Sequence, residues 1–434
     1  MRVLSSRRRV RGGWLAGVVI WVLASGAAAA AGNRPACPDT AALIARVRAL
    51  CSPDFKGRGN GTPEALAAAE SVTAWFAAAG LEAAGDAGGW HQDFALKGSE
   101  MEGLAARNVC GRLPGRGRLA GRWLVVGAHY DHLGAAAGGL PDAYHPGADD
   151  NASGVAVLCE LAHMLRGEGA ADPRPARGVV FVAFAGEEIG LQGSRWFVEH
   201  LPMARDSVDA MINLDSVGRL REGRLYVAGV GSAEALRELV EGAGVANDLR
   251  LEISRGGWDA GDHVSFLNAR MPALFLMTGP HAQYHTRADD WWLVSSEGLA
   301  RVARLARDLV ASLRTHEGSL VYTDVEGPPP ARPRVGAPSA EDRRAWFGIM
   351  PDFVESAEGV RVAGVLPDSP AAQAGLAPGD VIVAFDGRGV GNLQDYTLAL
   401  RARAPGDEVV VELQRGAQLL RLTVVLAARA EKRP

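Results

Sequence analysis

The chain has 434 residues, of which 48% are apolar and 22% are charged. This composition is ordinary for a globular protein and excludes an intrinsically disordered one, and the length is sufficient for two domains with a large buried core. The formal net charge of −4 argues against nucleic acid as the partner.

The first 31 residues have the basic, apolar and small-residue order of a secretory signal. Five arginines and no acidic residue lie in this segment, together with an apolar run at 14–23 and an alanine tract that offers several cleavage sites. We expect residues 1–31 to be a cleaved signal peptide, which leaves an exported periplasmic or extracellular protein with no stable membrane span. The alternative is a retained anchor, because residues 14–31 just reach the length that spans a bilayer.

The chain has four cysteines, and their spacings are not those of a zinc site. Cys159 lies in an apolar helical run and is expected to be a buried thiol. Cys37 and Cys51 flank a predicted helix that would hold them roughly 20 Å apart, which is too far for a disulfide bond.

From residue 39 onward the pattern alternates between helices and strands, which is typical of a parallel or mixed sheet covered by helices. Two helices are expected within 39–80, and the second has a clear start at Thr62-Pro63 and a stop at Gly80. The predicted strands are 123–128, 179–185, 210–215, 225–230 and 273–278. The further predicted helices are 154–165, 194–200, 233–242 and 297–313.

Residues 321–345 are rich in proline and are expected to form a semi-rigid linker. They separate two expected domains. The first, at 32–320, is an α/β domain with a mixed, mostly parallel central sheet flanked by helices. The second, at 346–430, is small and β-rich, as short β segments punctuated by glycine indicate.

Five short stretches place acidic and histidine side chains just after a predicted strand or at the mouth of a loop. The functional groups of an open parallel sheet lie beyond the carboxyl ends of its strands, so we expect these stretches to meet. They are Ala128-His129-Tyr130-Asp131-His132, Gly147-Ala148-Asp149-Asp150-Asn151, Gly186-Glu187-Glu188, Asn213-Leu214-Asp215 and Tyr284-His285-Thr286.

These side chains are the types that hold divalent cations in hydrolases, because zinc accepts both carboxylate oxygen and imidazole nitrogen. A pair of cations about 3.5–4 Å apart needs a bridging carboxylate and terminal ligands for each ion. Asp131, two residues after His129, is placed to orient that imidazole, and of the adjacent Glu187 and Glu188 we expect one ligand and one proton carrier. Each stretch alone has an ordinary structural explanation, such as a helix cap, and only the combination indicates a metal pair.

In order and spacing, the five stretches resemble the bimetallic zinc aminopeptidases, and the resemblance covers residues 40–315. It implies a secreted or membrane-bound exopeptidase with a mixed sheet flanked by helices and with two Zn²⁺ as cofactors, although cobalt or manganese can fill such sites. It also implies that His129 and Asp215 hold one zinc, that Glu188 and His285 hold the other, and that Asp149 bridges them.

The same resemblance implies roles for three further residues. Glu187 would be the general base, Asp131 the acid that orients the histidine, and Tyr284 a donor that steadies the oxyanion. The segment 261–266 resembles the family's Asp-His-x-x-Phe segment near the substrate pocket. The expected substrates are peptides with free N-termini.

Residues 346–428 resemble a PDZ domain of the kind attached to bacterial exported proteases. The resemblance rests on Phe347-Gly348-Ile349-Met350, on a short helix that starts at Ser369-Pro370, and on Gly379-Asp380 before a strand. It implies a groove that captures the C-terminal tail of a protein beside an open strand edge. The alternative is a module that binds no peptide and only steadies the peptidase.

Three other functions fit part of the sequence. A glutaminyl cyclase, a related one-zinc acyltransferase, is disfavoured because His129 and Asp215 are both present. A carboxypeptidase would need a basic clamp for the substrate carboxylate, which the sequence does not locate. A non-catalytic PDZ adaptor on a degenerate peptidase scaffold is disfavoured because the predicted ligands and the base are intact.

Overall fold

The computed structural model describes residues 37–98, 101–135, 143–168, 173–257, 261–324, 345–351, 359–366, 369–391, 395–396, 399–400, 402–416 and 418–428. The predicted signal peptide at 1–31 and most of the predicted linker at 321–345 lie outside these ranges. The predicted domain boundaries therefore stay predictions.

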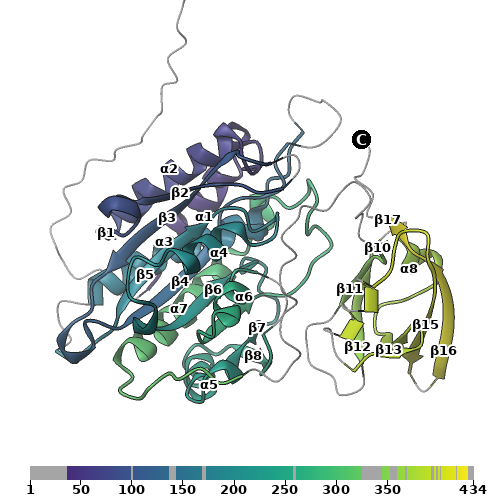
Figure 1. Ribbon diagram of the computed structural model, residues 1–434. Helices are drawn as coiled ribbons and strands as arrows, with labels where there is room; N and C mark the ends of the chain where they lie inside the picture. The colour runs from purple at the N-terminus through teal and green to yellow at the C-terminus, as the bar shows by residue number, and fades with distance from the viewer. Residues whose placement is uncertain are drawn as a thin grey trace, which may run out of the picture. The chain divides into compact units, whose positions relative to one another are not determined.

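The described part of the first domain is built on a nine-stranded sheet. Its strands are β1 (Glu82–Ala83), β2 (His91–Ala95), β3 (Ala105–Leu113), β4 (Trp123–His129), β5 (Gly178–Phe184), β6 (Val208–Leu214), β7 (Arg224–Ala228), β8 (Arg250–Ile253) and β9 (Ala273–Met277). They follow the order β1-β3-β5-β4-β6-β9-β7-β8, with β2 paired to β3 (Figure 1).

The centre of this sheet is parallel, an antiparallel pair adjoins it on each side, and the edge strand β8 pairs in parallel with β7. β4 pairs in parallel with β5 and β6, and β6 pairs in parallel with β9. β3 joins β5, and β7 joins β9, in antiparallel fashion. β5 and β6 are buried at every position, as expected for strands with helices on both faces. The predicted mixed, mostly parallel fold is confirmed.

Helices cover both faces of the sheet. They are α1 (Thr40–Leu50), α2 (Pro63–Ala78), α3 (Gly154–Glu168), α4 (Gln192–Glu199), α5 (Leu236–Ala246), α6 (His263–Asn268) and α7 (Ser296–Thr315). Residues of α1, α2, α3, α5 and α7 share one core, whereas α4 and α6 contribute to a second one. None of the described helices has both the length and the apolar character needed to cross a bilayer.

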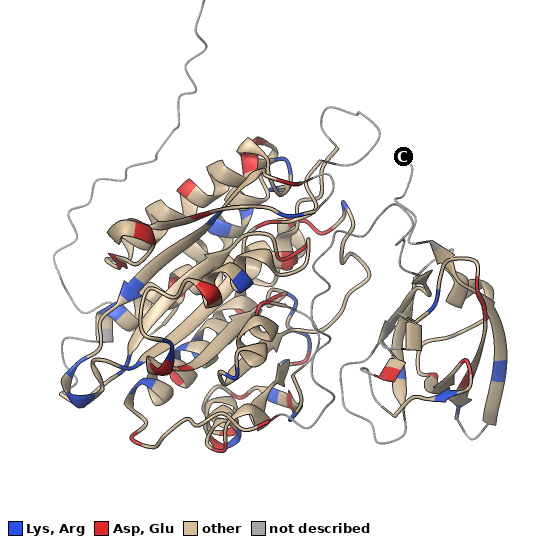
Figure 2. Cartoon of the chain, viewed as in Figure 1, with Lys and Arg blue, Asp and Glu red and all other residues tan. Residues whose placement is uncertain are grey.

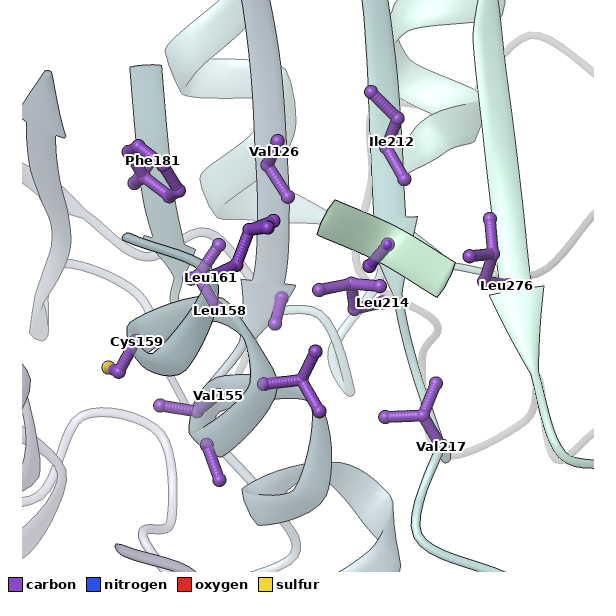
Figure 3. Packing of buried hydrophobic residues seen from close by; sticks show 14 of the residues in the cluster. Val126, Val155, Leu158, Cys159, Leu161, Phe181, Ile212, Leu214, Val217 and Leu276 are labelled. Carbon is purple, nitrogen blue, oxygen red and sulfur yellow. The ribbon is translucent and has the colours of Figure 1, made fainter. Parts of the chain in front are cut away.

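The two cores arise because successive side chains of a strand point to opposite faces. On β4, Val126 lies near Leu158 and Leu161 of α3 (Figure 3), while Val125 belongs to the core that contains Phe197 and Phe266. Charged residues are found mainly on helices and loops, and the central strands are mostly free of them (Figure 2). Cys159 is a buried free thiol, as predicted.

The sequence pattern missed β2 and β3. Their register places polar and charged residues such as Gln92, Asp93, Arg107 and Asn108 within the strands, so they lack the continuous apolar run of β5. The predicted start of α2 is confirmed, because the Thr62 hydroxyl accepts a hydrogen bond from the backbone N–H of Ala65.

The C-terminal domain is β-rich, as predicted. Its elements are β10 (Ala345–Trp346), β11 (Ile349–Pro351), β12 (Val360–Val365), α8 (Pro370–Gln373), β13 (Val381–Phe385), β14 (Arg388–Gly389), β15 (Glu408–Arg415), β16 (Gln418–Val425) and β17 (Ala427–Ala428). One antiparallel sheet has the order β11-β12-β13-β15-β16 with β14 on β13, and β10 pairs with β17. Phe347, Phe385 and Tyr396 form an aromatic cluster in its core.

Candidate metal centre

The candidate site lies beyond the carboxyl ends of the parallel strands. His129 is the last residue of β4, Glu187 and Glu188 follow β5, and Asp215 follows β6. The segment that contains His285 follows β9. Parallel strands end at the same edge of a sheet, so these four connections deliver their side chains to one place.

Two groups of side chains meet there. In the first, His129 Nε2 lies 3.2 Å from Asp150 Oδ1 and 3.4 Å from Asp215 Oδ1. In the second, His285 Nε2 lies 2.9 Å from Asp150 Oδ2 and 3.2 Å from Glu188 Oε2. Asp150 therefore belongs to both groups, with one oxygen in each.

These distances fit metal coordination. Two ligand atoms that each lie about 2.0–2.1 Å from a tetrahedral zinc are separated by roughly 3.3 Å, which is close to the spacings in both groups. His129 and Asp150 are at most 3% exposed, and Asp215 is 8% exposed. Buried carboxylates at this density repel one another unless a cation lies between them, so the donor set suits a divalent cation in each group.

The structure corrects the expected position of Asp149. Its neighbour Asp150 joins the two groups, whereas Asp149 points to the loop after β6, where its Oδ1 accepts the N–H of Gly218 at 2.6 Å. The turn at 148–153 has non-helical backbone angles at Asp150, which separates the directions of the two neighbours. Gly147 has φ of 56°, and a Cβ there would lie 2.3 Å from the carbonyl oxygen of Asp150, so only glycine fits this turn.

The structure also adds His132, which the sequence reasoning did not single out. Its Nδ1 lies 2.7 Å from Glu188 Oε1 and 3.7 Å from Asp150 Oδ2. The signal was present, because His132 stands three residues after His129 at the end of a strand. His132 contacts Oε1 of the Glu188 carboxylate, whereas His285 contacts Oε2.

Asp131 contacts the site in two ways. His129 Nδ1 lies 3.1 Å from the backbone carbonyl of Asp131, whereas the Asp131 carboxylate is 3.8 Å from the same nitrogen. The carboxylate instead accepts hydrogen bonds from the side chain of Asn60 at 2.6 Å and from the backbone N–H groups of Glu187 and Glu188 at 3.2 Å. Asp131 thus fixes the turn that carries both glutamates.

The two adjacent glutamates differ in their electrostatic surroundings. Burial, reinforced by the carboxylates of Glu188 and Asp215, raises the pKa of Glu187 well above its usual range. Burial also acts against ionisation of Glu188, but its contacts with His285 and His132 lower the pKa of Glu188 to about 2. Of the two glutamates, Glu188 is therefore the more readily ionised, and Glu187 holds a proton more readily.

Tyr284 lies at the open side of the site. Its side chain is 47% exposed, and its ring stacks on the His285 ring with centroids 3.9 Å apart. His285 itself has φ of 57°, a conformation that is costly for a residue other than glycine and is typical of functional sites.

The Asp-His segment noted in the sequence lies at the start of α6. Asp262 is fully buried, and burial raises its pKa to about 7. The His263 ring packs on Phe275, with centroids 4.8 Å apart. This segment lies next to the site, but its side chains belong to neither of the two groups.

A fully buried arginine supports the same loops. Arg58 donates hydrogen bonds to the backbone carbonyls of Leu50, Tyr130, Pro146 and Gly147, over 2.6–2.9 Å. Its guanidinium ties the loop after β4 to the turn before α3, and so fixes His129 relative to Asp150.

A buried cluster of acids and imidazoles beyond the carboxyl edge of a mixed α/β sheet is an arrangement that metal-dependent hydrolases use. Residues 108–310 match the model of Peptidase family M28, and residues 347–426 match that of the PDZ domain. The chain carries a peptidase family M28 domain followed by a PDZ domain.

Curated relatives agree with this family. Over 198 residues the chain is 31% identical to aminopeptidase YwaD of Bacillus subtilis, a match that covers 42% of this chain and 39% of YwaD. Over 223 residues it is 27% identical to leucine aminopeptidase 1 of Uncinocarpus reesii, covering 48% of this chain and 54% of the relative. The matches thus span about half or less of these relatives.

Solved structures show the same fold. The aminopeptidase LapA of Legionella pneumophila matches with a TM-score of 0.52 and 19% identity, covering 64% of this chain and 72% of LapA. A glutaminyl cyclase of Porphyromonas gingivalis matches with a TM-score of 0.51 and 20% identity, covering 64% of this chain and 99% of the cyclase. The fold by itself therefore does not separate peptidase from cyclase.

Proposed function

We propose that this protein is an exported aminopeptidase that hydrolyses N-terminal residues from peptides with a pair of zinc ions. The observation that carries the proposal is the Asp150 carboxylate, whose two oxygens face two different imidazoles at 3.2 and 2.9 Å. A carboxylate in that position would serve as a ligand to both cations.

The ligands divide into two sets. His129 and Asp215 would hold one zinc, Glu188 and His285 would hold the other, and Asp150 would bridge them. His132, closer to Glu188 than to Asp150, would orient the Glu188 carboxylate. Bound zinc would supply a Lewis acid and lower the pKa of a water molecule from 15.7 toward about 7.

The chain's own residues would then move the proton. Glu187 would accept the proton of the attacking water on its carboxylate and deliver it to the nitrogen of the leaving amine. Glu187 is available for this role because it belongs to neither metal-binding group. The Tyr284 hydroxyl would donate to the oxyanion that develops on the scissile carbonyl.

The charge of the site supports a preference for free N-termini. Asp150, Glu187, Glu188 and Asp215 bring four carboxylates together, so the free α-amine of a bound substrate would lie close to carboxylate oxygens. A substrate α-ammonium group is attracted to such a surface, while a substrate carboxylate is repelled.

For the C-terminal domain we propose capture of a protein C-terminal tail. In the described sheet β11 is a terminal strand, which can accept an added strand. Gly348, just before β11, has φ of 86°, and a Cβ there would lie 2.1 Å from the Cβ of Ser369. The glycine thus lets the loop approach the start of α8.

The decisive experiment joins metal analysis to a substrate panel. Purified protein should contain two equivalents of zinc and hydrolyse aminoacyl p-nitroanilides, and it should leave N-acetylated analogues intact. Chelation should abolish the activity. One equivalent of zinc with cyclisation of an N-terminal glutamine would instead indicate a cyclase, and a metal-free, inactive protein would indicate an adaptor.

A further inference from the structure

The Asp149 side chain is fully buried although it belongs to neither metal-binding group. Its Oδ1 accepts the N–H of Gly218, three residues after Asp215. Its Oδ2 lies 3.1 Å from Nε2 of His281, four residues before His285. Asp149 therefore touches the loops that carry two of the proposed ligands and is itself adjacent in sequence to a third.

Asp289 holds the backbone of the same turn. Its Oδ2 accepts the backbone N–H groups of Asp149 at 2.9 Å and of Asp150 at 3.2 Å, and its backbone carbonyl accepts the N–H of Ala148. Asp289 and His281 are both at most 3% exposed. The segment after β9 thus contacts the turn before α3 through His281 and Asp289, which lie on either side of His285 in the sequence.

We propose that Asp149, His281 and Asp289 form an interloop clamp that sets the geometry of the metal centre. The three residues belong to neither metal-binding group and would act through the ligands, so they are positioning residues, and the inference rests on the proposed metal-binding function. Their contacts fix Asp150, Asp215 and His285 relative to one another, although these ligands lie on three different loops.

The physical reason is the cost of misplacing a ligand. Zinc bonds have a narrow range of lengths, and a loop that drifts by a fraction of an ångström loses much of its contribution to affinity. Residues that orient ligands through such contacts change metal affinity by about 10–100-fold when they are replaced. Asp149 and His281 act on one another, so removing either partner should release the same restraint.

The test measures zinc affinity of the full chain, without reference to turnover. Wild type and the variants Asp149→Asn, His281→Gln and Asp149→Asn/His281→Gln are stripped of metal and titrated with zinc against a chromophoric chelator of known affinity. Each single variant should bind zinc about 10–100-fold more weakly. The double variant should be within about threefold of the weaker single one, because non-additive effects mark residues that act as a unit.

A matched control separates positioning from general stability. Asp209 is 3% exposed and is paired with Arg177 at the opposite end of β6. Asp209→Asn should destabilise the fold and leave zinc affinity unchanged. A loss of affinity in this variant as large as that in Asp149→Asn would overturn the inference.

The remaining outcomes are equally decisive. If the wild type binds no zinc, the proposed function fails. If the wild type binds zinc and the folded variants, checked by circular dichroism, bind it equally well, the clamp is refuted and the proposed function stands. If Asp149→Asn alone does not fold, the titration of His281→Gln decides.

Discussion

A buried acid lies at each end of β6, and the two acids have different kinds of partner. At its amino end, Asp209 is held by the guanidinium groups of Arg177 and Arg122. Just beyond its carboxyl end, the Asp215 carboxylate lies beside Asp150 and faces a single imidazole, that of His129. Both acids are at most 8% exposed.

The difference shows which end is built for stability and which for chemistry. A buried charge is costly unless it is paired, and the chain itself supplies the cations at the amino end. At the carboxyl end it gathers acids around imidazoles, which serve as metal ligands when they are neutral. This asymmetry is what a site for bound cations requires.

The largest expected effect follows from removing the carboxylate shared by the two groups. Asp150→Asn should lose both zinc ions and reduce hydrolysis to the level of chelated wild type. Chelation should lower the unfolding temperature of wild type by several degrees, because a ligand at 1,000 times its Kd stabilises by about 4 kcal/mol. Chelation should leave the unfolding temperature of Asp150→Asn unchanged.

Calorimetry with and without chelator measures this difference. The exposed acid Asp93, with a side chain that is 62% exposed, provides the control, since Asp93→Asn should keep the wild-type response. A chelator shift that persists in Asp150→Asn would place the cation elsewhere.

The next effect isolates the proton carrier. Glu187→Gln should keep zinc and fold but lose about 10²–10⁴-fold in kcat, as expected for removal of a general base. The matched control is Glu160→Gln, because Glu160 of α3 is a buried glutamate that binds Arg46 of α1 and belongs to neither metal-binding group. Steady-state kinetics with metal analysis decide, and retained turnover in Glu187→Gln would refute the assignment.

At the other end of β6, the expected effect is on stability alone. Arg177→Met leaves Asp209 with a partly exposed partner only, and breaking a buried ion pair costs about 3–5 kcal/mol. Urea denaturation of the metal-free protein should show this loss, while zinc affinity stays that of wild type. If zinc affinity fell instead, the two ends of the sheet would not be independent.

The smallest effect concerns the PDZ domain and pH. A hydrogen bond from Arg415 lowers the pKa of Asp380 below its usual 3.8, with Nε–Oδ1 and Nη2–Oδ2 distances of 2.7 and 2.8 Å. A carboxyl group whose pKa is lower in the folded than in the unfolded protein stabilises the fold at any pH above its pKa in the unfolded chain. This stabilisation is lost as the pH falls through its pKa in the folded protein.

Hydrogen exchange of β12 and β13 peptides in the full chain can detect this contribution. Wild type should be better protected than Asp380→Asn at pH 6, and the difference should shrink as the pH falls below about 4. Comparison at equal pH removes the change in intrinsic exchange rate. A difference that stays constant with pH would mean that the charge of Asp380 does not stabilise the domain.

Much of the fold was predictable because its signals are local. The strands β4, β5 and β9 are nearly continuous apolar runs, which identify buried parallel strands without knowledge of their neighbours. β3 was missed for the converse reason. It carries polar residues such as Arg107 and Asn108, and only its pairing with β2 and β5 makes it a strand.

The sequence by itself determined that acids and histidines follow the strand ends, and therefore that they meet at one edge of the sheet. Only the tertiary structure decided which of two neighbouring acids faces the cluster. Asp149 and Asp150 are equivalent in type and position along the chain. Their directions are set by the backbone of the turn, which Gly147 permits and which hydrogen bonds from a segment 140 residues away hold in place. Contacts of that range leave no trace in a local pattern, so the roles of Asp150, His132 and the interloop clamp became visible only in three dimensions.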